Sequence, residues 1–123
     1  MLLTLAALLI FLTGLAHSWL GERYLLRRLF KRENLPALLG STAFTTGTLR
    51  FVWHLLTLVW WGLAVLLLMA AQGPLQTRQL LQVFGTIAAL SALFPLVFTR
   101  GRHLSWVAFL AIALLLWMEA GKT

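Results

Sequence analysis

Four long stretches of the chain contain no Lys, Arg, Asp or Glu. They cover residues 1–21, 51–77, 79–99 and 103–118. A helix needs about 20 mostly apolar residues to cross the hydrocarbon core of a bilayer, which is about 30 Å thick. A soluble helix would also need a polar face for water, and segments such as 63–71 have none. The pattern therefore predicts an all-α, polytopic membrane protein with four transmembrane helices.

We place the membrane-spanning segments at about residues 2–21, 51–71, 80–98 and 103–118. At 123 residues, 61% of them hydrophobic, the chain has no room for a second domain outside these segments. We therefore expect residues 1–123 to form a single four-helix transmembrane domain, packed as a four-helix bundle. A bundle this small encloses little space, so we also expect a homo-oligomer or a subunit of a membrane complex.

The first helix is expected to continue past the membrane as an amphipathic basic extension over residues 23–32. The apolar side chains that recur there with helical spacing are Leu25, Leu26, Leu29 and Phe30. Cationic side chains take the opposite side, as suits a helix at an anionic membrane surface. Because the residue before a proline avoids helical geometry, Pro36 marks a break after this extension.

Basic residues gather at one set of helix ends. Eight of the ten Lys and Arg residues lie there, namely Arg23, Arg27, Arg28, Lys31, Arg32, Arg50, Arg100 and Arg102. Only Arg78 and Lys122 lie at the other ends. Cytoplasmic loops carry the excess of basic residues, so we predict that the loops after the first and third spans lie in the cytoplasm and that both termini lie outside. The orientation of the chain in the membrane and contact with membrane lipids explain the net charge of +7, and we expect no nucleic acid as a partner.

All three histidines fall at one level of this topology. His17 and His54 each lie about one turn inside the cytoplasmic end of a span, and His103 opens the fourth span at the same side. Ionisable groups within membrane spans are costly, which makes this level the candidate ligand site. Glu22 lies at the adjacent boundary. Small residues near His17, including Gly14 and Gly21, leave space for a close neighbour or a flat ligand.

Four interpretations of this level stay open. His17 and His54 could be axial ligands of a haem b, with Arg50, Arg100 and Arg102 at its propionates and Trp61 lining the site. A divalent metal such as zinc could be bound by His17, His54, His103 and Glu22. The same His and Glu set could relay protons in a small oligomeric transporter. In the fourth interpretation, which we favour, each His bonds a Thr or a carbonyl and holds helices together.

Two further features concern helix packing. Gly85, Ala88, Ala89 and Ala92 recur along the third span with the spacing that lets helices approach closely in lipid. Gln82 and Thr86 share a face of the same span and are expected to hydrogen-bond across helices.

Two segments, His17-Ser18-Trp19-Leu20-Gly21-Glu22 and Leu49-Arg50-Phe51-Val52-Trp53-His54, resemble those of small, uncharacterised four-span inner-membrane proteins of bacteria. This resemblance covers most of the chain and implies no activity or cofactor.

No catalytic constellation is visible in the sequence. There are no paired carboxylates and no phosphate-binding Gly loop, and the absence of Cys excludes disulfides and thiolate ligands. We therefore predict a non-enzymatic accessory subunit or binding module. A haem- or metal-binding redox protein and a small transporter remain the alternatives.

Overall fold

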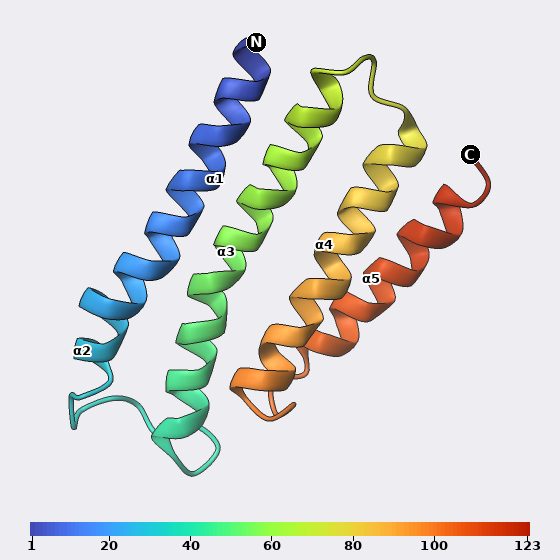
Figure 1. The fold of residues 1–123 in the computed structure, drawn as a ribbon. Coiled ribbons are helices and arrows are strands. Elements are labelled where there is room, and N and C mark those ends of the chain that lie inside the picture. Colours follow the sequence, from blue (N-terminus) through green and yellow to red (C-terminus); the bar gives the residue numbers. More distant parts are fainter.

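The computed structural model describes the whole chain, Met1–Thr123, and every regular element in it is helical. In order, the elements are α1 (Leu2–Leu20), η1 (Gly21–Leu26), α2 (Arg27–Leu29), α3 (Thr42–Ala70), α4 (Thr77–Phe98) and α5 (Ser105–Ala120). The long helices alternate in direction, so the N- and C-termini lie at the same end of the molecule (Figure 1). The all-α prediction with four principal helices is confirmed.

Helix boundaries differ from the predicted spans, most of all at the start of the second long helix and at both ends of the last. Helix α3 begins at Thr42 instead of residue 51, so the residues just before the predicted span are helical as well. The hydroxyl of Thr45 donates to the Pro36 carbonyl at 2.6 Å and fixes the preceding loop against the first turns of α3. Helix α5 covers Ser105–Ala120 in place of 103–118. Hydropathy identifies the residues suited to lipid, whereas a helix can extend beyond them as long as its backbone hydrogen bonds are formed.

The basic extension of the first helix, predicted over residues 23–32, is helical only as far as Leu29. α1, η1 and α2 form one continuous helical rod from Leu2 to Leu29, and Arg27 and Arg28 lie in its last turn. The sequence did not predict that residues Gly21–Leu26 adopt a π-helix. This wider turn lies at the centre of the candidate site described below.

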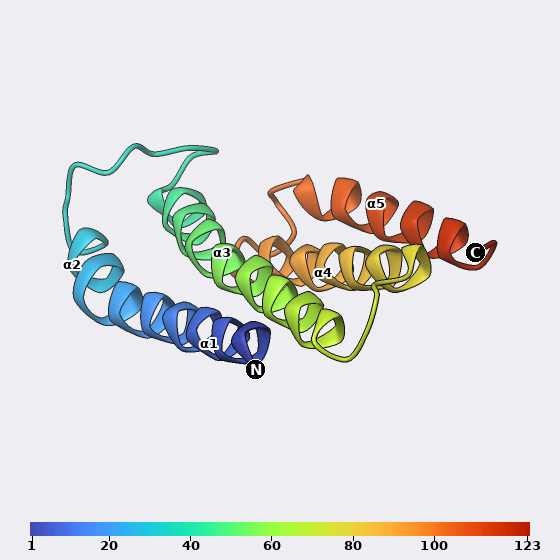
Figure 2. The same ribbon diagram turned by 90° about the horizontal axis from the view of Figure 1, so that it is seen from above.

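The four long helices form an open row. Helix α1 packs on α3, α3 on α4, and α4 on α5, and no other pair of these helices is in contact. Seen from above, α1 and α5 lie at opposite ends of the row (Figure 2). The four predicted helices are therefore present, but they pack as a row and not as a bundle around one shared core. Because the helices are apolar on nearly every side, the sequence pattern could not distinguish a closed bundle from a row.

Large and small side chains are distributed as expected for a protein surrounded by lipid. Only 19 of 123 residues are buried, and the buried set consists largely of Gly, Ala, Thr and Ser. Large apolar side chains point outward instead, for example Leu9 and Leu115. Three helical segments, Leu2–Leu29, Thr42–Ala70 and Thr77–Phe98, are long and apolar enough to cross a membrane, and Ser105–Ala120 is a shorter apolar helix.

Small residues form the contacts between neighbouring helices. Gly85, Ala88 and Ala92 of α4 are buried, as their spacing predicted, and the indole of Trp117 in α5 lies directly over Gly85. At the α3–α4 contact, Gly47 lies against the carbonyl oxygen of Phe98. Such positions bring backbones close together and so increase dispersion contacts in lipid.

Substitution of Gly47 should therefore destabilise the α3–α4 contact. A Cβ at this position would collide with the Phe98 carbonyl oxygen, which is backbone and cannot rotate away. We expect Gly47→Ala to lower the free energy of unfolding by about 1–3 kcal/mol, the usual cost of overpacking. Unfolding in detergent micelles measures this value. The matched control is Gly73→Ala, where no atom lies within 4 Å, and equal stability of the two variants would contradict the packing.

Candidate functional site at the seam between α1 and α3

Helix α3 donates three side-chain hydrogen bonds to backbone carbonyls of α1. The donors Trp53, Thr57 and Trp61 reach the carbonyl oxygens of His17, Gly14 and Phe11 at 3.1, 3.2 and 3.1 Å, respectively. Donors spaced by four residues share one helix face, and acceptors spaced by three share another. Because the two helices are antiparallel, the two sets meet in register. In lipid no water can satisfy an indole N–H, so these bonds stabilise one particular alignment of α1 on α3.

Two glycines of α1 make room for the indoles. A Cβ at Gly21 would collide with the Trp53 ring, and one at Gly14 would lie 2.8 Å from Nε1 of Trp61. The sequence predicted space here for a close neighbour or a flat ligand. The structure fills this space with the flat side chains of its own helix α3.

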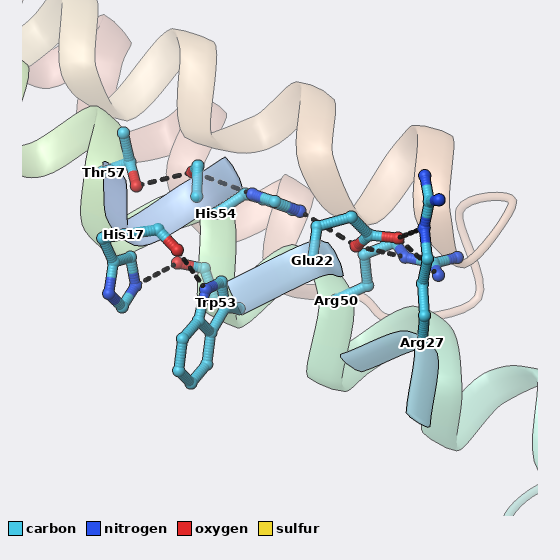
Figure 3. Close-up of polar contacts among 8 residues, drawn as sticks. His17, Glu22, Arg27, Arg50, Trp53, His54 and Thr57 are labelled. Atoms are coloured by element: carbon cyan, nitrogen blue, oxygen red, sulfur yellow. Dashed lines mark hydrogen bonds and ion pairs between the residues drawn. The ribbon is translucent and has the colours of Figure 1, made fainter. Parts of the chain in front are cut away.

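An ion pair lies at the basic end of the contact between α1 and α3, which we call the seam (Figure 3). Arg50 of α3 forms a bidentate pair with Glu22, with Nε to Oε2 at 3.0 Å and Nη2 to Oε1 at 2.9 Å. The side chains of Glu22 and Arg50 are 22% and 32% exposed, so the pair is largely withdrawn from solvent. Arg27 approaches the same carboxylate at 3.5 Å but is 66% exposed. Bidentate geometry makes the Arg50 contact the stronger of the two.

His54 extends this ion pair into a hydrogen-bonded chain. Its Nε2 lies 3.4 Å from Oε2 of Glu22, and its Nδ1 lies 2.9 Å from the hydroxyl of Ser18. The Ser18 hydroxyl lies 2.7 Å from that of Thr57, which in turn bonds the Gly14 carbonyl. Since a carboxylate only accepts hydrogen bonds, Nε2 must carry a proton to bond Glu22. When His54 is neutral, Ser18 is then the donor to Nδ1, and the single Thr57 hydroxyl proton is shared between the Ser18 hydroxyl and the Gly14 carbonyl.

The π-helix places Glu22 within this chain. Its backbone bonds join residues five apart, as in the bond from the Arg27 N–H to the Glu22 carbonyl. Gly21 and Leu26 are the buried residues of this segment, and Glu22 lies between them at the contact with α3. Single π-turns inside α-helices occur frequently at functional sites.

His17 and His103 do not join His54. The His17 ring stacks on Trp53 with centroids 4.4 Å apart, and its Nε2 lies 3.2 Å from the Trp53 carbonyl oxygen. His103 bonds the Ser105 hydroxyl at 2.8 Å and packs edge-on against Phe51 of α3. No group of three or more His, Asp or Glu side chains converges anywhere in the chain. Of the predicted metal set His17, His54, His103 and Glu22, the structure therefore brings together only His54 and Glu22.

The predicted cofactor-lining residues are also engaged within the protein. Arg50 is held by Glu22 and lies over the Phe30 ring at 5.0 Å from its centroid. Trp61 stacks on Phe11, whose carbonyl it also bonds. Arg100 and Arg102 line a separate hollow beside Phe44. The Nε2 atoms of His17 and His54 contact different partners, the Trp53 carbonyl oxygen and the Glu22 carboxylate (Figure 3).

Sequence reasoning missed the hydrogen-bonding role of Ser18 and the donor role of Trp53. The available signal was the four-residue recurrence of Trp53, Thr57 and Trp61, matched by the seven-residue spacing of Gly14 and Gly21 in α1. Large donors on one helix and glycines on the next indicate close contact between the two.

No family model, curated protein or solved structure matches this chain.

The two arginines beside Glu22 should contribute unequally to stability. In double-mutant cycles with Glu22→Gln, we expect a coupling energy of about 1–2 kcal/mol for Arg50→Gln. For Arg27→Gln we expect no more than about 0.5 kcal/mol, since exposed pairs contribute little. Reversible unfolding in mixed micelles measures both cycles. Equal coupling in the two cycles would show that Arg50 is not the partner that matters.

Proposed function

We propose that this protein is a small, non-enzymatic protein of the bacterial cytoplasmic membrane that spans the bilayer four times, with both termini outside. We propose further that it acts as an accessory subunit or binding module. One observation carries this proposal. The polar groups at the histidine level bond each other or backbone carbonyls, whereas the outward faces of the helix row are apolar and uncovered.

The hydrogen bonding at the seam supports a structural role for the histidine level. His17 bonds a carbonyl, and His54 bonds a serine and a carboxylate. The chain from Glu22 inward ends on the Gly14 carbonyl, which has no proton to pass on. This geometry favours the interpretation in which histidines hold helices together over proton relay, haem ligation or metal binding.

The open row supports a role in assembly. Helix α1 contacts only α3 and helix α5 contacts only α4, so both outer helices keep most of their surface free. Exposed apolar residues on these helices include Leu5, Leu12 and Leu114. Contiguous apolar faces bind lipid or another apolar helix. Membrane lipids and either a second copy of the chain or a larger membrane complex are the proposed partners.

Native mass spectrometry of protein released directly from membrane vesicles tests the assembly role. We expect a particle heavier than one chain plus bound lipid, either a homo-oligomer or a fixed complex with another subunit. Vesicles in which α1 carries Leu5→Arg and Leu12→Arg provide the matched control, because these changes place charge on its free face. A single chain released under all conditions, with no heavier particle, would overturn the proposal.

A further inference from the structure

Three polar residues form an exposed stripe along α4. Arg78, Gln82 and Thr86 follow one another at intervals of four and are all exposed. Thr86 lies two turns from Arg78, or about 12 Å along the helix. The sequence predicted bonds from Gln82 and Thr86 across helices. Instead, the Thr86 hydroxyl donates to the Gln82 carbonyl of its own helix at 2.8 Å, because α3 and α5 pack on other faces of α4.

The stripe has an unbalanced charge at its outer end. Arg78, at the start of α4, and Lys122, just after α5, are the only basic side chains at this end of the row. The ammonium of Lys122 pairs with Glu119 at 2.7 Å, so its charge is balanced within the chain. Arg78 forms no ion pair or side-chain hydrogen bond, nor does the Gln82 amide one turn deeper.

Beside the stripe lies an apolar groove between α3 and α4. Its volume is about 410 Å³, and Gln82 and Thr86 form its polar edge. The apolar lining includes Leu58, Val65 and Ile87. On the opposite side of the stripe, Arg78, Gln82 and Thr86 also line a hollow of about 450 Å³ beside Trp117. The stripe thus separates two hollows, with the charge at the outer end and an apolar groove running deeper.

We propose that this stripe and groove bind one phospholipid with a net negative headgroup. The phosphodiester lies at Arg78, an ester carbonyl accepts a hydrogen bond from the Gln82 amide, and an acyl chain occupies the groove toward Leu58 and Ile87. The lipid's phosphate, ester linkage and acyl chain thus follow one another in the same order as Arg78, Gln82 and the apolar groove. The inference rests on the proposed membrane placement, and not on the proposed role in assembly.

Charge decides between this ligand and a second copy of the chain. A two-fold contact centred on the stripe would set Arg78 against Arg78 of the other copy, with no acidic side chain in the stripe to separate them. Like charges facing each other across an interface are unfavourable. A phosphodiester supplies the one negative charge that Arg78 lacks, and an arginine guanidinium binds phosphate oxygens in bidentate fashion.

Titration of delipidated protein with phosphatidylglycerol, followed by native mass spectrometry, tests the proposal. We expect one tight phosphatidylglycerol site, weakened about tenfold or more in Arg78→Gln and less in Arg78→Lys, which keeps the charge but loses the bidentate geometry. Gln82→Leu should weaken it several-fold. Diacylglycerol with the same acyl chains, which lacks the phosphate, should bind at least tenfold more weakly. Lys122→Gln removes a basic residue at the same end and should leave the tight site unchanged.

Several results would overturn this site. Unchanged phosphatidylglycerol affinity in both Arg78→Gln and Gln82→Leu would do so. An equal loss in Lys122→Gln would show that only the general charge of this end matters. If diacylglycerol bound as tightly as phosphatidylglycerol, the phosphate would contribute nothing to binding. A dimer mass abolished by Arg78→Gln would assign the stripe to self-association. Because the substituted positions are exposed, retained helicity by circular dichroism separates loss of binding from misfolding, and loss of lipid binding leaves the assembly test unaffected.

Discussion

The hydrogen bonds from α3 side chains to α1 carbonyls hold the first helix in its place in the row. Helix α1 contacts no other long helix, so its position is determined by this seam alone. Without water in the membrane core, an indole N–H or a hydroxyl must find its acceptor in the protein. Trp53, Thr57 and Trp61 find theirs on α1 only if Gly14 and Gly21 allow the rings to approach. Side-chain size and hydrogen bonding therefore specify the same alignment.

The polar cluster at the basic end is a continuation of this seam. Glu22 is the one acidic residue at the α1–α3 contact, and it lies just after the first apolar stretch of the chain. Arg50 holds its carboxylate in a bidentate pair. His54 and Ser18 join that pair to Thr57, which already bonds the α1 backbone. Ion pair, imidazole and hydroxyl thus form one connected set that closes the end of the α1–α3 contact. The outer end of α4, by contrast, leaves Arg78 without an acidic partner.

Much of the fold could be predicted from the sequence, but the site only in part. Hydropathy, charge and spacing predict the number of helices, the continuation of the first helix beyond its apolar stretch and the small-residue contacts of α4. The order in which helices pack does not, because helices that are apolar all round have no unique inward face. The position of each histidine along its predicted span placed all three at one end of the row. That position does not tell which way a side chain points around the helix axis. His17 and His103 therefore lie apart from His54 despite their shared level.

The separation of α1 from α5 in a bilayer tests the open row most directly. Spin labels at Leu8 and Leu114, which are exposed and lie about equally far from the outer helix ends, report this distance by pulsed electron resonance. Dilution with unlabelled protein restricts the signal to single chains. Since α3 and α4 lie between them, we expect a distance on the order of 20 Å or more, as packed neighbours have axes about 8–10 Å apart. A distance typical of adjacent helices would show a closed bundle and contradict the row.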